Sequence, residues 1–125
     1  ASYPPHYLTF VSSKYNFAAR EFYEEYLYDD KGQVMFIYAR TPDVDFPKIH
    51  EIRLYFDGDH LLRLNVKEAD DLNSFEDNAV STASFKDVYT GTTIPEQYKE
   101  ACSMYKSYAR RFLEVFKAID GNTYL

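Results

Sequence analysis

The alternation of apolar and polar positions is most regular near the C-terminal end of the chain. From residue 94 to residue 119 apolar side chains recur at alternating gaps of four and three, the period of an amphipathic helix. Thr93 and Glu96 form a capping-box pattern, Pro95 lies in the first turn, and Gly121 follows the last apolar residue. We therefore predict a long helix that packs on a sheet or another helix. Its apolar stripe consists of Tyr98, Cys102, Tyr105, Ala109, Phe112, Phe116 and Ile119.

Shorter apolar runs predict strands. Residues 7–11 and 34–38 are β-branched and aromatic runs of strand length. Residues 49–56 and 60–66 flank a tripeptide with a central glycine, which is the pattern of a β-hairpin. The hairpin is the strongest strand signal in the chain.

A three-residue connection in this hairpin sets its register. It places Leu54 opposite Leu62 on one face, so that apolar side chains pair. On the other face it places Arg53 beside Arg63, a mildly unfavourable pair that Glu51 offsets where that face is solvated.

Residues 16–31 fit two periods. Asn16 is a suitable N-cap and Gly32 stands where a helix ends, so a helix is favoured. The alternative is a strand that turns back at residues 30–32. Further on, residues 67–78 are acidic and predict a surface connection or a short helix, and residues 79–93 predict another strand that ends in a loop. Within residues 16–31, the residues at helical spacing are Ala19, Phe22, Tyr23, Tyr26 and Leu27.

These elements predict an α+β fold in one globular domain over residues 1–125. An antiparallel sheet of about four or five strands packs against the long C-terminal helix, with a shorter N-terminal helix. The chain's 13 tyrosines and 10 phenylalanines predict an aromatic core.

The net charge of -6 disfavours binding to nucleic acid and to anionic membrane surfaces, and no run reaches the about 18 apolar residues of a membrane span. The Ala-Ser start without Met fits a secreted, processed chain as well as a trimmed one.

The chemistry-bearing residues form no recognised catalytic or metal motif. The three histidines lack ligand spacing, and we expect neither a metal nor a cofactor. Cys102 is the single cysteine and lies on the apolar stripe, which predicts inert packing rather than a nucleophile or an interchain disulfide. These observations favour a function other than catalysis.

Two hypotheses for function follow from the surplus of aromatic residues. The first is a binding module that holds a small apolar or aromatic ligand between a curved sheet and the C-terminal helix. The second is a protein-interaction module or homodimer that uses the aromatic helix. The expected ligand contacts are Phe36, Tyr38, Leu54, Phe56, Leu62, Tyr105, Phe112 and Phe116. The expected interface residues are Tyr98, Met104, Tyr108 and Arg111, with Tyr105 shared between the two hypotheses.

Overall fold

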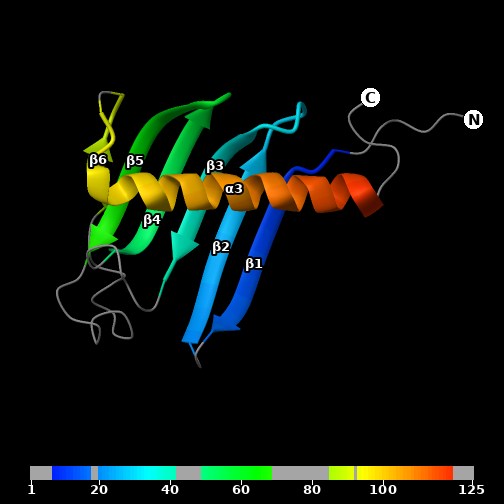
Figure 1. Cartoon of the computed structure of the whole chain (residues 1–125), viewed down its shortest axis with the longest axis horizontal. Helices are drawn as coiled ribbons and strands as arrows, with labels where there is room; N and C mark the ends of the chain where they lie inside the picture. Colours follow the sequence, from blue (N-terminus) through cyan, green and yellow to red (C-terminus); the bar gives the residue numbers. More distant parts are fainter. Residues whose placement is uncertain (1–6, 18–19, 42–48, 69–84, 92, 120–125) are drawn as a thin grey trace, which may run out of the picture.

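A computed structural model describes residues 7–17, 20–41, 49–68, 85–91 and 93–119. These residues form an antiparallel sheet of six strands and a long helix that lies across one face of it (Figure 1). The predicted α+β class is therefore confirmed, and the number of strands exceeds the four or five expected.

Each strand pairs with the next strand along the chain, so the order in the sheet is the order in the sequence. All of these pairs are antiparallel. The elements are β1 (Phe10–Phe17), β2 (Arg20–Tyr28), β3 (Val34–Arg40), β4 (Ile49–Asp57), β5 (His60–Glu68), β6 (Lys86–Tyr89) and α3 (Glu96–Ile119).

The predicted N-terminal helix is wrong, because residues 20–28 form strand β2. Side chains alternate along it: Glu24 and Tyr26 are buried, whereas Leu27 is exposed. The turn after β2 is stabilised by the Asp29 side chain, which accepts hydrogen bonds from two backbone N–H groups. Gly32 has φ 81° in this turn, so the glycine serves a hairpin and not a helix end.

The other short strands are close to the predicted segments. β1 begins within residues 7–11 and extends beyond them, β3 contains residues 34–38, and β6 lies within residues 79–93. The predicted surface connection or short helix over residues 67–78 falls mostly outside the described residues. Residues 67 and 68 belong to β5, and residues 69–78 are not described.

The β4–β5 hairpin has a two-residue turn in place of the predicted three-residue connection. Asp57 pairs with His60, and Gly58 takes φ 58° between them. The pairing shifts by one residue between Phe56 and Tyr55, which leaves Leu62 as the extra residue of a β-bulge. A bulged residue lacks a cross-strand partner, and the Leu62 side chain is 51% exposed.

This register corrects the predicted pairs. Leu54 lies opposite Leu64 instead of Leu62, and both residues of the pair are fully buried. Arg53 lies opposite Asn65, so two arginines do not face each other. The shift by two positions preserves the apolar face of the hairpin while it changes every neighbour on the polar face.

The helix α3 confirms the predicted C-terminal helix. It runs across the sheet from β6 at one edge to β1 at the other (Figure 1). Its end passes the β1 edge, which agrees with the 81% exposure of Ile119. The buried stripe of the helix therefore ends at Leu113, and Phe116 is only half-buried. The buried residues of α3 are Tyr98, Ala101, Cys102, Tyr105, Ala109 and Leu113.

In the part of the chain that the structure describes, no helix has the length and apolar character needed to cross a membrane.

Candidate ligand-binding site

The face of the sheet opposite α3, here called the open face, carries polar and aromatic side chains in register. Buried and open-face residues alternate along each strand, because successive side chains of a strand point to opposite faces. Register then aligns one open-face residue from each strand in a line across the sheet. We call this line the central row, and it consists of Ser12, Glu25, Tyr38, Arg53, Asn65 and Asp87.

Two further sets of side chains border the central row. On one side Phe36 lies opposite Tyr55, with ring centroids 5.0 Å apart. On the other side Glu51 lies opposite Lys67 in the sheet. The Lys67 Nζ atom is 3.1 Å from Glu51 Oε2, and the Tyr38 hydroxyl donates a 2.6 Å hydrogen bond to Glu51 Oε1. Glu51 is therefore held by both neighbours.

A hollow of about 340 Å³ lies over the middle of this face. Aromatic rings and charged groups line it, whereas the layer beneath α3 is largely apolar. Its lining residues are Glu25, Phe36, Tyr38, Glu51, Arg53, Tyr55, Lys67 and Phe85.

Arg53 contributes a guanidinium group to the hollow. Its guanidinium Cζ lies 3.7 Å from the centroid of the Phe85 ring, a stacked cation–π contact. Among the described residues no carboxylate pairs with Arg53, whereas Lys67 has Glu51. A stacked guanidinium keeps its N–H donors in the plane of the group, where they can bind a carboxylate at two points.

Tyrosine hydroxyls in and beside the hollow are fixed as donors to carboxylates. Burial, followed by the hydrogen bond to Glu51, raises the pKa of Tyr38 above its ordinary value. Tyr23 donates a 2.6 Å hydrogen bond to Glu25, and this bond is the main cause of the raised pKa of Tyr23. Both hydroxyls therefore remain protonated at neutral pH.

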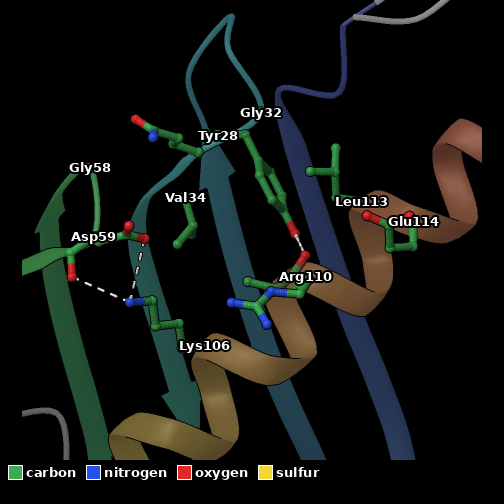
Figure 2. Close-up of a pocket in the computed structure, with 11 residues that line it drawn as sticks. Tyr28, Gly32, Val34, Gly58, Asp59, Lys106, Arg110, Leu113 and Glu114 are labelled. Atoms are coloured by element: carbon green, nitrogen blue, oxygen red, sulfur yellow. Dashed lines mark hydrogen bonds and ion pairs between the residues drawn. The ribbon is translucent and has the colours of Figure 1, made fainter.

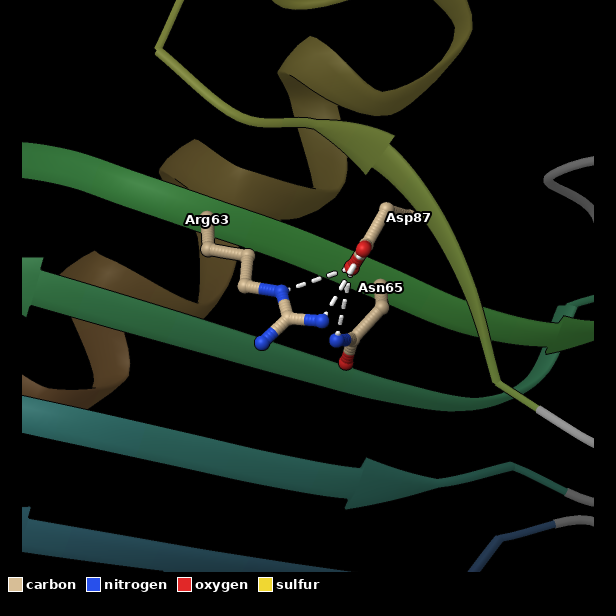
Figure 3. Close-up of polar contacts among 3 residues, drawn as sticks. All are labelled: Arg63, Asn65 and Asp87. Carbon is tan, nitrogen blue, oxygen red and sulfur yellow. Dashed lines mark hydrogen bonds and ion pairs between the residues drawn. The ribbon is translucent and has the colours of Figure 1, made fainter.

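A polar network of Arg63, Asn65 and Asp87 lies beside the hollow (Figure 3). Arg63 binds Asp87 at two points, with distances of 2.7 Å and 2.9 Å, and the Asn65 amide donates to the same carboxylate at 3.1 Å. The hydrogen bond from Arg63 is the main reason that the pKa of Asp87 lies below its ordinary value. These bonds join β6 to β5, and Phe85 directly precedes β6.

The amide of Asn65 has only one orientation that suits this network. Asp87 offers acceptors only, so the Asn65 nitrogen must face it. The Asn65 side chain is 3% exposed, and within the described structure its Oδ1 atom has no hydrogen-bond partner. The central row thus contains a buried acceptor next to Arg53 in the register.

A second hollow, of about 230 Å³, lies between the hairpin turns and α3 (Figure 2). Its polar groups hold the helix to the sheet. The Tyr28 hydroxyl donates a 2.6 Å hydrogen bond to the backbone carbonyl of Ala109. The ammonium group of Lys106 contacts both the backbone oxygen and the carboxylate of Asp59. Because Tyr28, Lys106 and Asp59 already have partners, we interpret this hollow as a structural junction.

Glu24 places a carboxylate between the sheet and the helix. It is 3% exposed and accepts hydrogen bonds from Tyr15 at 2.7 Å and Tyr26 at 2.5 Å. Burial, then the bond to Glu24, raises the pKa of both tyrosines, which keeps their hydroxyls as donors. Two donated hydrogen bonds satisfy the buried carboxylate and explain its place in an otherwise aromatic core.

The predicted ligand contacts divide between the two faces. Only Phe36 and Tyr38 line the open-face hollow. Phe112 contacts the Tyr26 ring, with centroids 5.1 Å apart. The others are placed as follows: Leu54, Phe56 and Tyr105 are buried in the core, Phe116 is half-buried, and Leu62 is exposed.

Sequence reasoning missed Arg53, Glu25 and Phe85 as site residues. Arg53 and Glu25 alternate with buried residues in their strands, and this period of two was the available signal. Phe85 gave no signal, because its contact with Arg53 depends on the pairing of β6 with β5.

The predicted interface residues lie along α3 at different depths. Tyr98 is 2% exposed and belongs to the core, Met104 and Tyr108 are half-buried, and Arg111 is exposed. Tyr108 makes an edge contact with the buried ring of Tyr105 at 6.2 Å. The aromatic side chains of the helix are therefore buried or half-buried.

Cys102 is buried, as the prediction of inert packing requires. Burial raises the pKa of its thiol to about 11, which disfavours the reactive thiolate. Among the described residues no group of three or more His, Cys, Asp or Glu side chains could hold a metal ion.

Comparison with models of protein families, with curated proteins and with solved structures gives no match for this chain. Its function is therefore inferred from the chemistry of its own residues.

Proposed function

We propose that this chain is a non-enzymatic binding module for a small aromatic molecule that carries an anionic group. The molecule occupies the hollow on the open face. The observation that carries this proposal is the guanidinium of Arg53, which is stacked on Phe85 and has no carboxylate partner among the described residues.

The dimensions and walls of the hollow support a ligand of this kind. Its volume of about 340 Å³ lies near the lower end of the roughly 300–1,000 Å³ range of small-molecule pockets. Phe36 and Tyr55 present neighbouring rings against which an aromatic ligand can pack. Arg53 supplies paired N–H donors for the anionic group.

The open face is a better location for the ligand than the space between sheet and helix. In that space the side chains of both layers pack into one core cluster, and residues expected to contact ligand, such as Leu54 and Tyr105, contribute to it. On the open face, by contrast, charged and aromatic groups line a hollow. Polar groups that fix the orientation of a ligand among apolar walls are typical of binding sites.

A matched pair of probes tests the proposal. Hydrocinnamate carries a phenyl ring and a carboxylate, and its amide is a neutral analogue of similar shape. We expect hydrocinnamate to bind more tightly in calorimetry and to shift the NMR signals of β3, β4 and Phe85. Arg53→Gln should weaken its binding about tenfold, the effect of losing one charge-assisted contact.

Arg110→Gln is the control, because Arg110 is exposed on α3 and lies outside the open-face hollow. It should leave the affinity unchanged. Equal affinity of acid and amide, or signal shifts confined to α3, would contradict the proposal.

A further inference from the structure

We infer that the ligand of the open-face hollow is a zwitterion, with an ammonium group as well as a carboxylate, of the length of a short aromatic peptide with free termini. This inference rests on the proposed function, because it assumes that Arg53 binds the carboxylate. It adds a second recognition group, Glu25, which lines the same hollow.

Glu25 is a carboxylate with capacity to spare. The Tyr23 hydroxyl donates to its Oε2 atom, and in the described structure no cation pairs with it. The neighbouring acid, Glu21, differs, because Lys14 lies 3.5 Å from it. An ionised carboxylate has about four acceptor positions, so one bond from Tyr23 leaves room for an ammonium group.

The hollow is lined by two positive and two negative side chains, and this balance favours a ligand that is neutral overall but carries one charge of each sign. Glu51 and Lys67 form an ion pair with each other. Arg53 and Glu25 remain, with one charge of each sign. A ligand with a carboxylate alone would satisfy Arg53 and leave Glu25 unpaired and repelled by it. A zwitterion satisfies both groups at once.

The spacing of these two groups indicates the length of the ligand. Glu25, Tyr38 and Arg53 are consecutive members of the central row. Adjacent strands are about 4.8 Å apart, so the Cα atoms of Glu25 and Arg53 are about 10 Å apart. An extended peptide gains about 3.5 Å per residue, so two or three residues match this span better than a single amino acid does.

The part of the hollow between the two charged groups suits an aromatic side chain. Phe36 and Tyr55 form a ring wall beside the central row. The hydroxyl of Tyr38 is occupied by Glu51, so the ring of Tyr38 is the surface that it offers to a ligand. A short peptide with one aromatic residue therefore matches the rings as well as both charges.

Four peptides with the same backbone test the inference by calorimetry. The probes are glycylphenylalanine, its N-acetyl form, its C-terminal amide, and the form blocked at both ends. We expect the free dipeptide to bind most tightly and each single block to weaken binding about tenfold.

The variants assign each end of the peptide to a residue. In Glu25→Gln, N-acetylation should no longer weaken binding, while amidation still does. In Arg53→Gln, amidation should lose its effect. Glu21→Gln is the matched control, since Glu21 lies on the same strand and face but outside the hollow, and it should behave as the parent chain does.

The failure of this inference is distinguishable from the failure of the proposed function. If the N-acetyl peptide binds as tightly as the free dipeptide and amidation still weakens binding, Glu25 has no role and the ligand is a simple anion. If hydrocinnamate binds but no peptide binds at millimolar concentration, only this inference is overturned. If amidation has no effect, or if neither hydrocinnamate nor any peptide binds, both the inference and the proposed function are overturned.

Discussion

Two buried tyrosines predict that the protein loses stability in alkaline solution. Tyr26 is 0% exposed and Tyr105 is 4% exposed. Burial is the main cause of the raised pKa of both groups, and the charge of the nearby Glu24 contributes in the same direction. In the folded state the ionised form is therefore disfavoured, while in the unfolded state a tyrosine ionises near pH 10.

The sign and size of the effect follow from proton linkage. Because the folded pKa is raised, the stability is fully present below the unfolded value and is lost as the pH rises toward the folded one. At about pH 11 the unfolded chain gains about 1.4 kcal/mol per tyrosine, so the two together cost about 3 kcal/mol. This is a large part of the roughly 5–15 kcal/mol that stabilises a typical domain.

Urea unfolding, followed by circular dichroism from about pH 8 to about pH 11, measures this loss. Tyr105→Phe removes one ionising hydroxyl and keeps the ring, so its free energy of unfolding should fall by about 1.4 kcal/mol less over the same interval. The Cys102 thiol, whose pKa burial raises to about 11, ionises in both chains and cancels in the comparison. Equal losses in the parent chain and in Tyr105→Phe would refute the reasoning.

Two further predictions concern the bulge and the polar network. Leu62 is exposed, so Leu62→Ala should change the free energy of unfolding by no more than about 0.5 kcal/mol. Leu64 is buried opposite Leu54, so Leu64→Ala should lower the free energy of unfolding by about 2–5 kcal/mol. Equal effects of the two substitutions in urea unfolding would argue against the observed register. Asp87→Asn should weaken hydrocinnamate binding in calorimetry, because the loss of the Arg63 contact frees β6 and the Phe85 ring that supports the site. Its effect on unfolding should be small, since this ion pair is exposed, and an unchanged affinity would show that the network does not position Phe85.

The sequence determined the elements whose signals are local. The C-terminal helix was predictable over almost its full length, because a period of 3.6 residues repeats many times between Thr93 and Ile119. β3 and the β4–β5 hairpin followed from apolar runs of strand length bounded by turn residues. These signals were sufficient for the α+β class and for the covering of one sheet face by the helix.

Other features were decided only by tertiary structure, because they depend on partners distant in the sequence. The carboxylate of Glu24 is buried beneath the helix because tyrosine hydroxyls from β1 and β2 donate hydrogen bonds to it. The candidate site likewise needs Arg53 of β4 beside Phe85, a contact made only when β6 pairs with β5. Hydrogen bonding and stacking between separate strands leave no periodic signal within either strand, so only the folded chain brings these groups together.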